Sequence, residues 1–259
     1  MELNRLIQAI RINTGRLILD VRLLFNQRIK PRIPPFFGYL NIHSALAIAG
    51  IIGPLILTAS DLTAAVANAD YSLVRDSISS LAITRIGWLQ TIGFLAQGLL
   101  LEIFAAGLLF NVKRRQGFHI GIAIFVIFGF AMLLIGAFRT DPASTVEAAR
   151  TIEGRIHGLT ATTAFLLFPF AILLLMPSLK RDPAWKILYR YTGVTFILAV
   201  ILVIITRIVQ ETSGWFGLAE RLLVANMIIW VEVAAVRLFI LSLKRGVKTQ
   251  VSAQNPSSA

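Results

Sequence analysis

Ser79, Asp141 and His157 are the residues of this 259-residue sequence whose types fit nucleophilic chemistry. A serine hydroxyl, an imidazole and a carboxylate together supply a nucleophile, a base and a group that orients the base. The three residues are far apart in the sequence, so only the fold can bring them together. A structural interpretation is also open, because Ser and Asp are favoured at helix N-termini, where their oxygens accept backbone hydrogen bonds.

Further polar residues are expected at the same depth and extend this trio to a binding pocket for a small solute or a lipid head group. These residues are Asp76, Arg139, Glu220 and Arg221. Sequence neighbours of opposite charge, Arg139 with Asp141 and Glu220 with Arg221, could instead neutralise each other at a membrane surface. The sequence leaves both interpretations open.

A second polar set, His43, Glu102, Glu232 and Arg237, falls inside or at the edge of long apolar stretches. At 1.5 Å per residue, Glu102 and Arg237 lie roughly 12 and 9 Å from the same end of their stretches, so we predict that they pair. Glu232 lies nearer the middle and needs a partner, a proton or water. This intramembrane polar cluster would either line a proton or solute path or fasten the helices together.

The sequence predicts no cofactor and no metal site. It has no cysteine, and its three histidines, His43, His119 and His157, fall at opposite ends of the apolar stretches, where they cannot meet at one ion. A haem between His43 and His119 would lie very near the surface. The sequence also lacks a glycine-rich phosphate loop and the HExxH and GxSxG motifs of common hydrolases.

Composition indicates what must position these residues. The chain is 56% hydrophobic and 15% charged, whereas soluble domains carry about a quarter charged residues. Stretches of about 20 apolar residues are long enough to cross a bilayer as helices. We therefore predict an all-α polytopic bundle of six transmembrane helices. The predicted spans are 40–59, 87–110, 120–138, 159–176, 192–208 and 222–243.

The net charge of +12 would suit a nucleic-acid-binding protein, but its position along the chain excludes that class. Lys and Arg are in excess in residues 1–39, 111–119, 177–191 and 244–259, which are alternate connections and the two termini. Short cytoplasmic segments retain positive charge. We therefore predict that both termini are cytoplasmic and that Ser79, Asp141 and His157 lie on the outer side of a cell membrane.

Three domains are expected: a basic arm over 1–39, a six-helix transmembrane domain over 40–243 and a disordered cytoplasmic tail over 244–259. The arm has the pattern of an amphipathic helix, and residues 1–32 would contact anionic lipids of the inner leaflet. A soluble arm packed on the loops is the alternative. Partners are therefore the lipid bilayer and no nucleic acid, and the oligomeric state is undetermined.

Four segments at the predicted outer face resemble a known family. They read YSLVRDSISSLA, GAFRTDP, GRIHGLTATTAF and GLAERLLV, in this order. Over residues 40–243 they resemble the bacterial six-helix membrane family called domain of unknown function 998, which is distantly similar to the DRAM, Frag and Sfk group. The resemblance implies a six-helix fold in a bacterial plasma membrane. It marks Ser79, Asp141, His157, Glu220 and Arg221 as recurring polar positions, but it implies no established reaction.

Three functions are consistent with these observations. The first is an integral membrane protein of uncharacterised activity that binds or moves a small solute or lipid head group through the outer polar pocket, without catalysis. The second is an outward-facing lipid hydrolase or transferase that uses Ser79, Asp141 and His157. The third is a membrane scaffold that recruits partners through its basic arm.

The charge pattern generates a topology prediction. Alkaline phosphatase, which is active only outside the cytoplasm, is expected to be inactive when fused after residue 259 and active when inserted within residues 67–70. The physical reason is that the Lys- and Arg-rich connections remain on the cytoplasmic side. Phosphatase activity from the C-terminal fusion, measured in whole cells, would contradict the topology.

Overall fold

All regular elements of the computed structural model, which describes residues 40–209 and 213–254, are helices. Six of them are long and apolar enough to cross a bilayer, which confirms the predicted all-α membrane bundle. The predicted basic arm, 1–39, lies outside the described residues. The described elements are α2 (Ile42–Val66), η2 (Ile78–Ile83), α3 (Gly87–Asn111), α4 (Phe118–Ala137), η3 (Glu147–Ala149), α5 (Ile152–Arg181), α6 (Leu188–Ile208) and α7 (Phe216–Gln254), where η marks short 3-10 helices.

Helices α5 and α7 extend furthest beyond their predicted apolar stretches. Helix α5 begins at Ile152 because the Thr151 side chain accepts a hydrogen bond from the Gly154 N–H and so caps the helix. Helix α7 runs to Gln254, past the domain boundary expected at residue 243, because the sequence offers no proline before Pro256.

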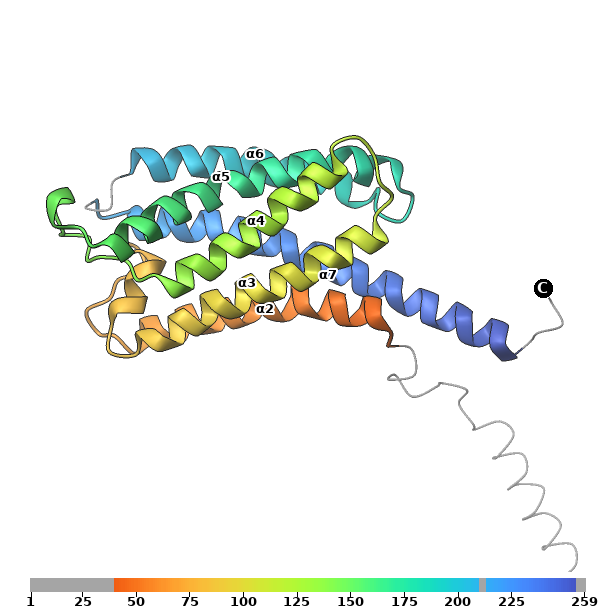
Figure 1. The fold of residues 1–259 in the computed structure, drawn as a ribbon, viewed down its shortest axis with the longest axis horizontal. Helices are drawn as coiled ribbons and strands as arrows, with labels where there is room; N and C mark the ends of the chain where they lie inside the picture. Colours follow the sequence, from red (N-terminus) through yellow and green to blue (C-terminus); the bar gives the residue numbers. More distant parts are fainter. Residues whose placement is uncertain (1–39, 210–212, 255–259) are drawn as a thin grey trace, which may run out of the picture.

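The six long helices form a closed ring of contacts. Figure 1 shows these helices from the side. Consecutive helices run in opposite directions and pack against each other, and α7 packs against α2 to close the ring. Every backbone polar group inside a bilayer must be satisfied within the protein, and α-helices satisfy their own. Backbone hydrogen bonds other than those within the helices are therefore found mostly in the links at the two ends of the ring.

An aromatic cluster fills the middle of the ring. It is defined as Phe104, Phe125, Phe128, Phe168 and Trp230, which come from α3, α4, α5 and α7. Neighbouring ring centroids lie 5.5 to 6.3 Å apart. Lipid is as apolar as these side chains, so close packing and not the hydrophobic effect is what holds helices together at this depth. The Trp230 indole N–H is satisfied by the Thr192 hydroxyl, 3.0 Å away.

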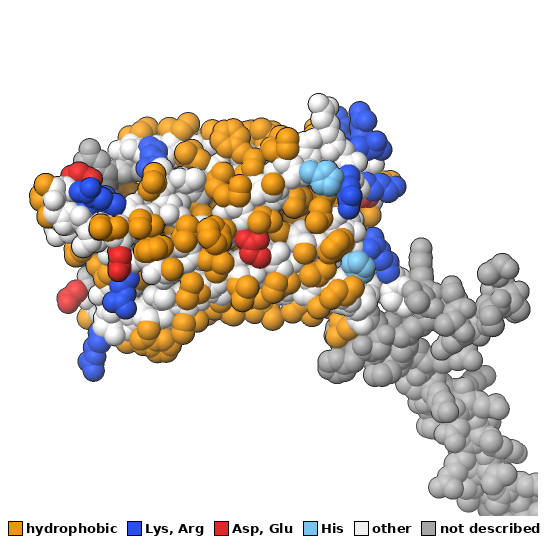
Figure 2. Space-filling view, viewed as in Figure 1, with side chains coloured by type: hydrophobic (Ala, Val, Ile, Leu, Met, Phe, Trp, Pro, Cys, Tyr) orange, Lys and Arg blue, Asp and Glu red, His pale blue; other side chains and the backbone are white. Residues whose placement is uncertain are grey.

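The two ends of the ring differ in charge. We call the end that carries η2 and η3 the pocket end and the opposite end the basic end. Figure 2 shows apolar side chains over the middle of the molecule and Lys, Arg and His gathered at one end. The basic end carries Lys113, Arg114, Arg115, Lys180, Arg181, Lys186, Arg190, Lys244 and Arg245. The pocket end mixes arginines with acids.

At the basic end, Asp182 ties two links together. Its buried carboxylate accepts hydrogen bonds from the backbone N–H groups of Lys113 and Ala184, each at 2.9 Å. Beside it, the Trp185 indole donates to the Asn111 carbonyl at 3.0 Å. These contacts close the basic end of the ring beneath the aromatic cluster.

Candidate functional site

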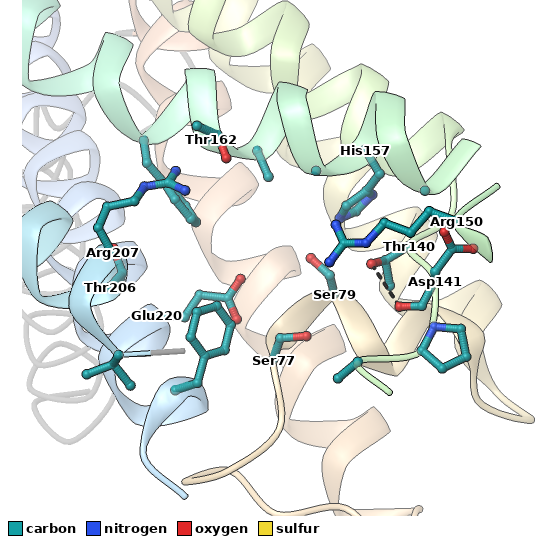
Figure 3. Close-up of a pocket in the computed structure, with 18 residues that line it drawn as sticks. Ser77, Ser79, Thr140, Asp141, Arg150, His157, Thr162, Thr206, Arg207 and Glu220 are labelled. Carbon is teal, nitrogen blue, oxygen red and sulfur yellow. Dashed lines mark hydrogen bonds between the residues drawn. The ribbon is translucent and has the colours of Figure 1, made fainter. Parts of the chain in front are cut away.

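At the pocket end, a cavity of about 390 Å³ lies between the ends of α5, α6 and α7 and the links that hold η2 and η3. We call it the head cavity. Four residues singled out by the sequence line it, namely Ser79, Asp141, His157 and Glu220. Asp76, Arg139 and Arg221 do not line it. In Figure 3, Ser79, His157, Glu220 and Arg150 come from different elements and face the same space.

Ser79 is placed by a short 3-10 helix whose start is doubly fixed. The Ser77 hydroxyl accepts from the Ser80 N–H at 3.2 Å and caps η2. The buried Glu220 carboxylate, on α7, accepts from the Ile78 N–H at 2.6 Å. A charge-assisted bond of this length anchors η2 to α7. Glu220 therefore serves first to position the segment that carries Ser79.

His157 lies on α5 and is buried. Its Nδ1 is 2.8 Å from the Phe138 carbonyl oxygen at the end of α4. A carbonyl only accepts hydrogen bonds, so Nδ1 carries the hydrogen in this contact. The backbone carbonyl at the end of α4 thus orients the imidazole.

Asp141 caps the start of α5. Its carboxylate accepts from the Thr151 N–H and from the Thr151 hydroxyl, both at 2.9 Å. A Cβ at Gly154 would collide with this carboxylate, so glycine is needed there. The bonds of Asp141 agree with the capping interpretation, and they leave His157 oriented by Phe138.

Arg221 holds the link between α2 and α3 against α7. Its guanidinium donates to the carbonyls of Leu73 and Asp76, each at 2.9 Å, and to the Asp61 carboxylate at 3.1 Å. It also donates to the Tyr71 hydroxyl. Arg221 pairs with Asp61 on α2, and the Glu220 carboxylate accepts the Ile78 N–H of η2, so each of these sequence neighbours bonds a separate element.

Burial and hydrogen bonding shift the pKa values of two groups in the link between α2 and α3, Tyr71 and Asp76. Burial raises the pKa of Tyr71 to about 12, although the neighbouring Arg221 opposes the shift. The hydroxyl therefore stays protonated at neutral pH and donates to the Ser77 carbonyl at 2.8 Å. The hydrogen bond from Arg75 lowers the pKa of Asp76, which also accepts from the Ser72 N–H. Asp76 therefore shapes the link beside the cavity.

The intramembrane set does not form one cluster. Arg237 donates to the Ala184 carbonyl at 2.8 Å, and it makes no ion pair with Glu102, so the predicted pair is wrong. His43 contacts Asn111 through Nδ1 at 3.0 Å. The prediction used only the depth of Glu102 and Arg237 in the membrane. It took no account of the direction in which each side chain points around its helix axis, and the two side chains contact different helices or links.

Glu102 and Glu232 are only partly buried. Figure 2 shows one acidic group in the middle of the apolar surface, over α3 and α4. Glu102 is the acidic residue of α3, and α4 has none. Its carboxyl lies against Gly129 of α4. Among the described residues, no three His, Asp or Glu side chains come together to hold a metal ion.

Sequence reasoning missed two arginines, Arg150 and Arg207, that line the head cavity. Arg150 lies in the link before α5, and Arg207 is near the end of α6. Figure 3 shows them on opposite sides of the cavity. Arg150 forms an exposed pair with Glu147 at 3.1 Å. The placement of Arg150 depends on how the link before α5 folds back, for which the sequence gives no local signal. Arg207 lies in the last turn of α6.

The family description protein of unknown function (DUF998) matches residues 51–237, which include all four recognised segments. The chain belongs to the DUF998 family. No curated protein and no solved structure matches it. The more distant similarity of this DUF998 protein to the DRAM, Frag and Sfk group stays a prediction. Membership agrees with an integral membrane protein and assigns no activity, so function must be argued from the site.

The Arg221 contacts predict a stability effect. Arg221→Gln is expected to lower the free energy of unfolding by about 2 to 3 kcal/mol, because it leaves the partly buried Asp61 carboxylate without its partner. The measurement is thermal or denaturant unfolding of the detergent-solubilised protein. Arg75→Gln, which removes an exposed guanidinium in the same link, is the matched control and should change little. Equal losses in the two variants would contradict the role of Arg221.

Proposed function

We propose that this protein binds a small solute or a lipid by an anionic head group held in the head cavity. The observation that carries the proposal is the pair Arg150 and Arg207, which come from separate elements and line one cavity together with several hydroxyl groups. Guanidinium groups are well suited to bind phosphate and carboxylate. A volume of about 390 Å³ lies within the range of ordinary ligand pockets. The hydroxyl groups belong to Ser77, Ser79, Thr140, Thr162 and Thr206.

The two acids of the cavity do not oppose this proposal. Asp141 is bonded to Thr151, and Glu220 is bonded to the Ile78 N–H. Their negative charge is compensated by backbone and hydroxyl donors. The cationic groups that face the cavity are therefore the ones suited to a ligand's negative charge.

A lipid head group and a free solute share this chemistry. Position supports the lipid, because Thr206 and Arg207 end a membrane span and so lie at the depth of the head groups. Binding is also better supported than passage across the membrane. The aromatic cluster fills the ring below the cavity, and the contacts of Asp182 and Trp185 close the basic end.

The orientation of the protein belongs to this proposal. With the basic end in the cytoplasm, the head cavity opens on the outer side of the cell membrane, and both termini are cytoplasmic. Contact of residues 1–32 with anionic lipids, and the scaffold hypothesis built on it, concern a segment outside the described residues. The hydrolase hypothesis rests on Ser79 and His157 alone, because Asp141 is bonded elsewhere, and it stays a prediction.

Binding of an anionic head group predicts a loss in a double variant. Arg150→Gln with Arg207→Gln is expected to weaken the binding of glycerol 3-phosphate or of phosphatidate at least about tenfold, because charge-assisted bonds are lost. Calorimetry in neutral detergent measures the affinity for glycerol 3-phosphate, and native mass spectrometry measures how much phosphatidate stays bound. The two measurements therefore distinguish a free solute from a lipid as the ligand.

Arg155→Gln is the matched control, since Arg155 lies exposed on α5 and does not line the cavity. It should bind both compounds as the wild type does. The proposal is overturned if the wild type binds neither compound, or if the double variant binds them as tightly as the wild type.

A further inference from the structure

Below the head cavity lies a second, smaller hollow of about 40 Å³, which we call the lower chamber. It shares four lining residues with the head cavity, so the two spaces are adjacent. The shared residues are Ser79, Ala161, Phe165 and Glu220. The rest of its wall is apolar except for Gln97 on α3. The polar cavity thus adjoins an apolar one, toward the middle of the membrane.

The lower chamber ends on the aromatic cluster. Phe128 lines the chamber and is also a member of that cluster, 5.5 Å from Phe168 between ring centroids. Gln97 is ten residues into α3, which places it about 15 Å below the start of that helix at Gly87. Whatever enters the chamber therefore reaches well into the apolar layer and stops at the rings.

Gln97 is the unusual member of this wall. Its side chain is 2% exposed, and among the described residues its Oε1 has no hydrogen-bond partner. Gly53 on α2 makes room for it, since a Cβ there would lie 2.8 Å from Oε1. A buried amide oxygen without a partner is unfavourable unless a group in the chamber donates a hydrogen bond to it. A hydroxyl group suits this position because it can donate that hydrogen bond.

We propose that the ligand is a single-chain anionic amphiphile whose chain enters the lower chamber and carries a hydroxyl group that bonds Gln97. This inference rests on the proposed binding of an anionic head group and adds the class of the ligand. A chamber of about 40 Å³ has no room for two chains. Met132 and Met227 line it, and these flexible side chains can move to widen it for one chain.

The test uses inorganic phosphate and n-alkyl phosphates of two to eight carbons, titrated into the full-length protein in neutral detergent. Affinity is expected to rise roughly fourfold for each added methylene until the chamber is full. A phosphate whose alkyl chain ends in a hydroxyl group should bind about tenfold tighter than the plain alkyl phosphate at the length that reaches Gln97. Gln97→Leu should abolish this preference and keep the dependence on chain length.

Val224→Phe fills the lower chamber from α7 and should remove the gain with chain length while inorganic phosphate binds unchanged. Val236→Phe, on the exposed side of the same helix, is the matched control and should keep the gain. If Val224→Phe does not fold, the chain-length series in the wild type and in Gln97→Leu still decides the matter.

The outcomes separate the two proposals. If phosphate binds but affinity does not change with chain length, the chamber does not take a chain, and this inference is overturned while head-group binding stands. If chain length matters but a hydroxyl group brings no gain in the wild type, the role of Gln97 is overturned. If neither phosphate nor any alkyl phosphate binds, the proposed function fails together with the inference.

Discussion

The guanidinium of Arg221 is the interaction on which the pocket end depends. It joins the carboxylate of Asp61 on α2, the hydroxyl of Tyr71 and two carbonyls of the link between α2 and α3. A membrane bundle gains little from burying apolar surface against lipid, so side chains that satisfy backbone groups hold its ends. By fixing this link, Arg221 sets where η2 begins, and the bond from Ile78 to Glu220 then places Ser79 at the head cavity.

From the pocket end to the basic end, the interior of the ring changes in character. Arginines and hydroxyl groups line the head cavity, apolar side chains line the lower chamber, and five rings fill the space beneath. Asp182 and Trp185 then close the basic end. This order matches the order of groups in an amphiphile, with a charged head and an apolar chain. The same order disfavours passage through the ring, because the rings fill the route.

The sequence predicted the spans well, because the length of an apolar stretch is a local property that the bilayer imposes. It also grouped Ser79, His157 and Glu220, because residues at the same ends of neighbouring spans share a depth. It could not predict direction around each helix axis, so the Glu102 to Arg237 pair was wrong. Asp141 and the missed Arg150 depend on how the link before α5 folds back, which involves contacts that no single segment encodes.

The central claim is that the head cavity and the lower chamber together bind one anionic single-chain amphiphile. An experimental structure of the protein in lipid nanodiscs prepared from its native membrane tests this most directly. We expect one elongated density, with its wider end between Arg150 and Arg207 and its narrow end beside Gln97. Density that fills only the head cavity, or a lipid bound solely on the outer surface of the ring, would contradict the claim.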